Sequence, residues 1–168
     1  MTGLARDLLE QASFLCGRER KRPKQASLRR AVSSAYYALF HLLIEASVAH
    51  FGSRSPMALR RLMARAYSHG DMLAACKHLA LGTPPPHLSA LLATPVEADL
   101  RLIATAFVEL QDQRHRADYD LSAGFTRIGV DMLITKVEDA FQAWERVAGT
   151  HNAKVFLSAL LLGKAWKR

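Results

Sequence analysis

The 168-residue chain contains only two cysteines, Cys16 and Cys76. Neither belongs to a CxxC pair or to a Cys/His cluster with the spacing of a zinc site. This scarcity argues against a disulfide scaffold, and we expect two buried thiols in a reducing cytosol. Half of the residues are hydrophobic, so the chain can bury a full core without crosslinks or metal. Its length fits one domain, 1–168, better than two.

Long apolar runs and the common catalytic motifs are also missing. The stretch 159–162 is far too short to cross a bilayer, and the N-terminus has no basic segment followed by an apolar core. We therefore expect a cytoplasmic protein. There is no HExxH, Walker loop or GxSxG. His69, His78 and His87 are separated by helix breakers, so we expect no metal site, and nothing indicates a cofactor.

Basic residues exceed acidic ones, with a formal net charge of +8. This charge suits an anionic partner such as RNA, DNA, a nucleotide or an acidic protein. Solubility combined with a few non-specific basic loops explains it equally well. The densest basic stretch, 18–24, is interrupted by Pro23, and proline and charge repulsion together predict a loop.

Apolar residues at spacings of three and four predict a series of helices separated by glycine and proline. The expected helices are 4–16, 25–51, 56–68, 72–80, 95–119, 125–148 and 151–162, with a break at 84–86 that is followed by a short helical turn. Asp71 is expected to cap the fourth helix and Pro95 to lie in the first turn of the fifth. Three long antiparallel helices (about 25–51, 95–119 and 125–148) with shorter ones predict an all-α, up-and-down bundle without a sheet.

Each expected helix has an apolar face that we assign to the core. These faces comprise Leu4, Leu8, Ala12 and Leu15; Leu28, Val32, Ala35, Leu39, Leu42 and Ala46; Leu59, Leu62, Met63 and Ala66; Leu100, Ile103, Phe107 and Leu110; Val130, Leu133, Val137, Phe141 and Trp144; and Val155, Phe156, Ala159 and Leu162.

A polar stripe runs along the 25–51 helix beside its core face. Its members are Arg30, Ser34, Tyr37, His41 and Glu45. A carboxylate one turn from an imidazole can raise the imidazole pKa and fix its tautomer, so the stripe could be the wall of a site. It could instead be a solvated face, with Tyr36 and Phe40 turned into the core, and the geometry alone favours this second interpretation.

Charged residues continue the core face of the 95–119 helix beyond Leu110. Arg114 and Asp118 lie four residues apart there, and a charge in a core position must be paired or lie in a cleft. They could pair with each other and close the end of the bundle, or line a pocket with the polar stripe. The neighbouring His115, Arg116 and Tyr119 are residue types that grip phosphates and stack on bases.

Two segments together resemble a known family. Residues 29–41, RRAVSSAYYALFH, resemble the early helix of HEPN-domain proteins, and residues 114–119, RHRADY, resemble their later R-x-x-A-D-Y segment. The resemblance covers about residues 4–148 and leaves 149–168 as a C-terminal helical extension. It implies a bundle that commonly dimerises and binds or cleaves RNA. Many members are metal-independent ribonucleases of toxin–antitoxin or defence systems, and others are binding modules beside nucleotidyltransferases.

The resemblance leaves catalysis open. In the nuclease members an arginine that holds the phosphate is followed four to six residues later by a proton-shuttling histidine. Here His115 follows Arg114 directly, and Arg30 and His41 are about three turns apart, too far for one scissile phosphate. His41 could instead meet Arg114 across the bundle.

The leading hypothesis is therefore an HEPN-like nucleic-acid-binding protein with a basic groove near 18–24, Arg30 and 114–116. Alternatives are a non-catalytic module that binds a nucleotide, a small ligand or a partner protein, and a defence component that works with a neighbouring gene product. A homodimer and a nucleotidyltransferase partner are expected by analogy. The candidate binding residues are Arg30, Tyr37, His41, Arg114, His115, Arg116, Asp118 and Tyr119.

Overall fold

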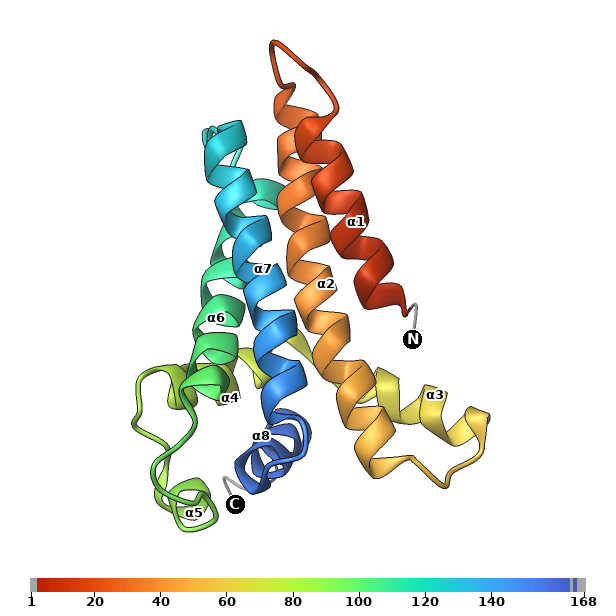
Figure 1. The fold of residues 1–168 in the computed structure, drawn as a ribbon, viewed down its shortest axis with the longest axis vertical. Helices are drawn as coiled ribbons and strands as arrows, with labels where there is room; N and C mark the ends of the chain where they lie inside the picture. Colours follow the sequence, from red (N-terminus) through yellow and green to blue (C-terminus); the bar gives the residue numbers. More distant parts are fainter. Residues whose placement is uncertain (1–2, 164, 166–168) are drawn as a thin grey trace. The chain divides into compact units, whose positions relative to one another are not determined.

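The computed structural model describes residues 3–163 and residue 165, and Figure 1 shows its helices. These are α1 (Leu4–Gly17), α2 (Gln25–Phe51), α3 (Met57–Arg65), α4 (His69–Ala80), α5 (Pro86–Ser89), α6 (Ala98–Tyr119), α7 (Arg127–Val147) and α8 (His151–Leu162). The described residues form no strand, and the long helices α2, α6 and α7 pack together as a bundle, which confirms the predicted fold class. Of the expected C-terminal extension, residues 164 and 166–168 lie outside the described part.

Two predicted helix starts are wrong. The N-cap of α4 is Ser68, whose hydroxyl accepts the backbone N–H of Asp71 at 3.1 Å, so Asp71 lies inside the first turn. Pro95 precedes α6, because the carbonyl of Glu97 accepts the N–H groups of Leu100 and Arg101 at 3.1 and 3.3 Å. In both places the backbone hydrogen bonds, and not the preference of one residue type, set where the helix begins.

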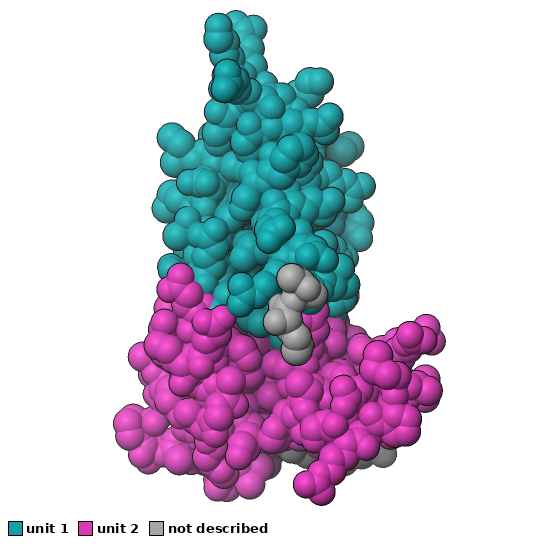
Figure 2. All heavy atoms as spheres, turned by 45° about the vertical axis from the view of Figure 1, so that its right-hand side comes forward, with its two compact units in different colours: residues 1–42, 106–141 teal, residues 43–105, 142–168 magenta. Residues whose placement is uncertain are grey.

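The chain divides into two compact units, coloured separately in Figure 2. Unit 1 comprises residues 1–42 and 106–141, which include α1, the first part of α2, the second part of α6 and most of α7. Unit 2 comprises residues 43–105 and 142–168, with α3, α4, α5, α8 and the remaining parts of the long helices.

The core of unit 1 is formed by the predicted faces of α2, α6 and α7. Its buried side chains include Leu28, Val32, Ala35, Tyr36, Leu39, Phe107, Leu110, Val130, Leu133, Val137 and Phe141. The predicted face of α1 is wrong in part, because Leu4 is 51% exposed and the buried residues are Ala5, Ala12 and Cys16. Small side chains on that face let a helix backbone approach its neighbour closely.

The core of unit 2 is built around α8, which packs on α4. Its buried side chains include Met72, Cys76, Leu79, Ala153, Val155, Phe156, Leu157, Ala159 and Leu160. Leu162, predicted to point inward, is 41% exposed near the helix end. On α2 the buried positions are Leu43 and Ser47 in place of Leu42 and Ala46, because the core stripe continues from Leu39 in steps of four.

Helix α3 differs most from expectation, since none of its residues is buried. Leu59 and Leu62, predicted to point inward, are 46% and 61% exposed. The side chain of Arg60 instead anchors the segment by donating to the carbonyls of Gly52 at 2.8 Å and Ser53 at 2.6 Å. An amphipathic spacing shows which residues share a face, but another element must be present to cover that face.

Helix α2 is the one described helix whose length and composition would allow it to cross a bilayer. Within the structure, 67% of its most apolar window is buried. Core helices of globular proteins meet the same test of length and composition.

Both cysteines are free and buried, as predicted. Burial raises the pKa of both thiols above the ordinary value, so little reactive thiolate forms near neutral pH. We expect neither Cys16 nor Cys76 to react with iodoacetamide in native buffer, and both to react in denaturant. Intact-mass spectrometry counts the adducts. Rapid native labelling of Cys76, which is completely buried, would contradict the packing of α4.

Candidate functional site

Six of the eight predicted site residues, all except Arg30 and Arg116, gather where α2 and α6 run side by side in unit 1. We call this region the α2–α6 seam. Ser33 donates to Asp118 Oδ1 at 2.6 Å, and the Arg114 Nη2 group donates to the Tyr37 hydroxyl at 3.1 Å. These contacts pair early positions of α2 with late positions of α6, so the two helices are antiparallel. The seam therefore brings together two segments that are more than 70 residues apart in the chain.

Arg114 is the central residue of the seam. Its Nε atom lies 2.9 Å from Asp118 Oδ2, and the side chains of the two residues are 17% and 22% exposed. The guanidinium carbon lies 5.7, 5.5 and 5.9 Å from the ring centres of Tyr36, Tyr37 and Tyr119. Arginine stacks favourably on aromatic faces, so three tyrosines and one carboxylate compensate its partial desolvation.

The predicted pairing of Arg114 with Asp118 is present. The two residues pair with each other, and they also contact Ser33 and Tyr37 of α2. Burial alone would lower the pKa of the Arg114 guanidinium, but Tyr37 and Asp118 outweigh it and keep that pKa above its ordinary value. Arg114 is therefore a fixed positive charge at physiological pH.

The solvent-facing part of the seam is aromatic. Tyr119 is 65% exposed, and its ring centre lies 5.1 Å from the ring of the exposed His115. The half-buried Tyr37 and His41 rings lie 6.4 Å apart along α2. His41 is thus connected to Arg114 through the Tyr37 ring, and Tyr119 lies directly beside Arg114.

The polar stripe of α2 is not a solvated face. Tyr36 and Phe40 are buried, as that interpretation expected, but Ser34 is buried as well and donates to Gln11 of α1 at 3.1 Å. Tyr37, His41 and Glu45 are half-buried, and Arg30 is exposed. The stripe is divided because α1 packs against one of its edges and α6 against the other.

Sequence reasoning missed Arg29, which organises the turn between α6 and α7. Its guanidinium donates to the carbonyls of Ala117 and Asp120 at 2.9 Å each, Ala123 at 2.5 Å and Leu121 at 3.4 Å. The guanidinium also lies 5.8 Å from the Phe125 ring centre. The predicted end of a helix implies backbone carbonyls that need donors from elsewhere in the chain. The sequence does not show which side chain supplies those donors.

The basic loop, residues 18–24, is held in place by Arg127 of α7. Arg127 donates to the carbonyl of Arg20 at 3.0 Å and to the carbonyl of Glu19. The Glu19 carboxylate accepts from the Ser27 hydroxyl at 2.8 Å, and that bond lowers its pKa. The predicted loop is confirmed, and its five basic side chains are exposed: Arg18, Arg20, Lys21, Arg22 and Lys24.

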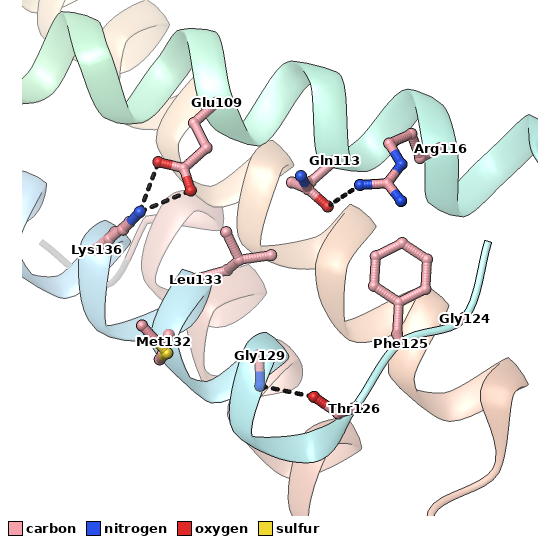
Figure 3. A pocket seen from close by; sticks show the side chains of 10 residues that line it. All are labelled: Glu109, Gln113, Arg116, Gly124, Phe125, Thr126, Gly129, Met132, Leu133 and Lys136. Carbon is pink, nitrogen blue, oxygen red and sulfur yellow. Dashed lines mark hydrogen bonds and ion pairs between the residues drawn. The ribbon is translucent and has the colours of Figure 1, made fainter.

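Arg116 lies apart from the seam. It lines a groove of about 320 Å³ between the end of α6, the connecting loop and the start of α7, shown in Figure 3. Arg114, predicted to share one basic groove with it, contacts α2 instead. The two residues are two positions apart on one helix and therefore point in different directions.

Among the described residues, no group of three or more His, Cys, Asp or Glu side chains could hold a metal ion. Comparisons with family models, curated proteins and solved structures find no match to this chain.

Proposed function

We propose that the protein binds single-stranded nucleic acid through the α2–α6 seam. The observation that carries the proposal is Tyr119, a 65% exposed aromatic ring with His115 on one side and the fixed charge of Arg114 close by. Exposed aromatic rings stack on unpaired bases whatever their sequence, and Arg114 packs against the Tyr119 ring that would stack. RNA is the favoured nucleic acid, because residues 29–41 and 114–119 resemble HEPN-domain proteins.

Exposed cations lie at the same end of unit 1 as Tyr119. Arg29 bonds the carbonyl of Ala117, so the first turns of α2 lie beside the end of α6. Arg30 is exposed on those turns, and the basic loop leads directly into them. A nucleic-acid strand stacked on Tyr119 would have these cations within reach for phosphate contacts.

The proposal concerns binding and not cleavage. Arg114 is engaged by Asp118 and by Tyr37, and α6 has no histidine four to six residues after it. A phosphate-activating arginine needs donors aimed at the reacting group and a proton carrier within hydrogen-bond reach. The described contacts of Arg114 support a role in positioning the tyrosine rings.

We expect Tyr119→Ala to weaken binding of a fluorescein-labelled 12-nucleotide RNA by about 5- to 10-fold, the loss of one stacked base. Tyr119→Phe is the matched control and should bind within about twofold of the wild type, because the ring is retained. Fluorescence anisotropy at several salt concentrations measures both. Equal losses in the two variants would contradict stacking.

Arg30→Ala should weaken RNA binding at low salt and reduce the slope of log K against log salt by about one, as expected for one lost phosphate contact. Binding by the wild-type protein that does not weaken with rising salt would contradict the proposal, because phosphate contacts release counterions. The same titration with a DNA oligonucleotide of equal length tests the preference for RNA.

A further inference from the structure

The groove that contains Arg116 has a distinct chemistry at each end (Figure 3). At one end Arg116 and the Phe125 ring lie together, and the Gln113 amide oxygen accepts from Arg116 at 3.4 Å. At the other end Lys136 Nζ contacts both carboxylate oxygens of Glu109 at 2.6 Å. The buried Leu133 lies between the two ends.

The lining is suited to a flat, apolar body that carries a negative group. Phe125 and Leu133 offer apolar surface, and aromatic rings stack on heterocycles. Glu109 and Lys136 neutralise each other, so Arg116 supplies the remaining charge of the lining. The Arg116 guanidinium can bind a phosphate through two parallel hydrogen bonds. The Glu109–Lys136 pair presents carboxylate acceptors and an ammonium donor to the edge of a base.

The volume of the groove is suited to a small molecule. A volume of about 320 Å³ lies at the lower end of the range for small-molecule sites. The groove is open and shaped by three chain segments, α6, the loop at 124–126, and α7. The loop is fixed by two bonds between its Phe125 backbone and the side chain of Gln25, at 2.8 and 2.9 Å. The site is thus already formed, which reduces the entropic cost of binding.

We propose that this groove binds a mononucleotide, with the base against Phe125 and Leu133, the base edge toward Glu109 and Lys136, and the phosphate on Arg116. The site is separate from the α2–α6 seam and is independent of RNA binding there. It would make the protein responsive to a free nucleotide, whether or not it also binds a polymer.

The test is isothermal titration calorimetry of the full chain with adenosine 5′-monophosphate, adenosine and inorganic phosphate as separate probes. Adenosine monophosphate should bind most tightly, and Arg116→Gln should weaken its binding by about 10-fold while leaving adenosine binding unchanged. Phe125→Leu should weaken both nucleotide and nucleoside by about fivefold. Arg61→Gln, an exposed arginine on α3, is the charge-matched control and should bind as the wild type does.

Gly124→Leu is a second variant, chosen because it should alter the groove without affecting folding. Gly124 lines the groove, and a Cβ atom added there would meet no atom within 4 Å, so a larger side chain can be placed at the edge of the groove without removing a contact. It should weaken nucleotide binding while the circular dichroism spectrum is unchanged. The proposal is overturned if adenosine monophosphate does not bind, if all groove variants bind it normally, or if inorganic phosphate binds equally well.

Results for the groove and the seam can be told apart. Tyr119→Ala should leave binding of adenosine monophosphate unchanged, and Gly124→Leu should leave the RNA titration unchanged. Loss of nucleotide binding in Tyr119→Ala, with wild-type affinity in Gly124→Leu, would place the nucleotide on the seam and overturn the groove proposal.

Discussion

Arg29→Ala is expected to lower the free energy of unfolding by about 3 kcal/mol. The guanidinium of Arg29 donates to four carbonyls of the α6–α7 turn, at distances between 2.5 and 3.4 Å. Alanine would leave these acceptors without their charged donor and would remove the contact with the Phe125 ring. Water can reach part of the turn, so the expected loss is smaller than the sum of four charged hydrogen bonds.

Arg30→Ala is the control for this prediction, because it removes the same side chain one position along the helix. Arg30 is exposed, and its replacement should leave the urea midpoint unchanged while reducing RNA affinity. Urea unfolding followed by circular dichroism measures both variants. Equal stabilities for Arg29→Ala and Arg30→Ala would show that the carbonyl contacts of Arg29 contribute little.

Asn152→Ala is expected to lower the free energy of unfolding by a similar amount, about 3 kcal/mol, through contacts in unit 2. The Asn152 side chain is 2% exposed and makes three hydrogen bonds. It accepts from the Ala93 N–H at 2.7 Å and donates to the Ala93 carbonyl at 2.9 Å and to Glu97 at 2.8 Å. Alanine would remove the side chain that holds both the Ala93 backbone and the Glu97 carboxylate.

Lys154→Ala, an exposed position on the same helix, is the control and should have wild-type stability. The pH dependence provides a second check. Burial acts to raise the pKa of Glu97, but the bonds from Asn152 and its other neighbours hold it below the ordinary value. This contribution exists above the ordinary pKa of glutamate and is lost as pH falls through the lower pKa of Glu97 in the folded state. The difference in stability between the two proteins should therefore narrow at acidic pH, while the two bonds between Asn152 and Ala93 keep it above zero. A constant difference down to pH 3 would contradict the role of Glu97.

Helix positions and most core faces were predictable because they depend on local spacing. The faces of α6 and α7 follow from apolar residues repeated every three or four positions, and Phe107 and Val137 are fully buried as predicted. Helix α3 has an equally clear pattern, yet Leu62 is largely exposed. The difference is that α6 and α7 have neighbours to pack against, and a spacing within one helix carries no information about neighbours.

The candidate site was predictable only in part. Arg114 and Asp118 were singled out because two charges continued an apolar face, and the structure places them against Ser33 and Tyr37. Arg116 belonged to the same string but lines a separate groove with Phe125, a residue that no motif indicated. In a helix, the side chains of adjacent residues point in different directions, so neighbours in the sequence can line different sites.

The sequence by itself determined the all-α class, the three long helices, the basic loop and the buried state of both thiols, because periodicity, breakers and hydrophobicity act over a few residues. Only the tertiary structure decided that Arg29 closes the α6–α7 turn, that Asn152 holds the segment before α6, and that Arg114 and Arg116 face different sites. Long polar side chains can reach many acceptors, and the packing of segments distant in the chain selects the one that each contacts.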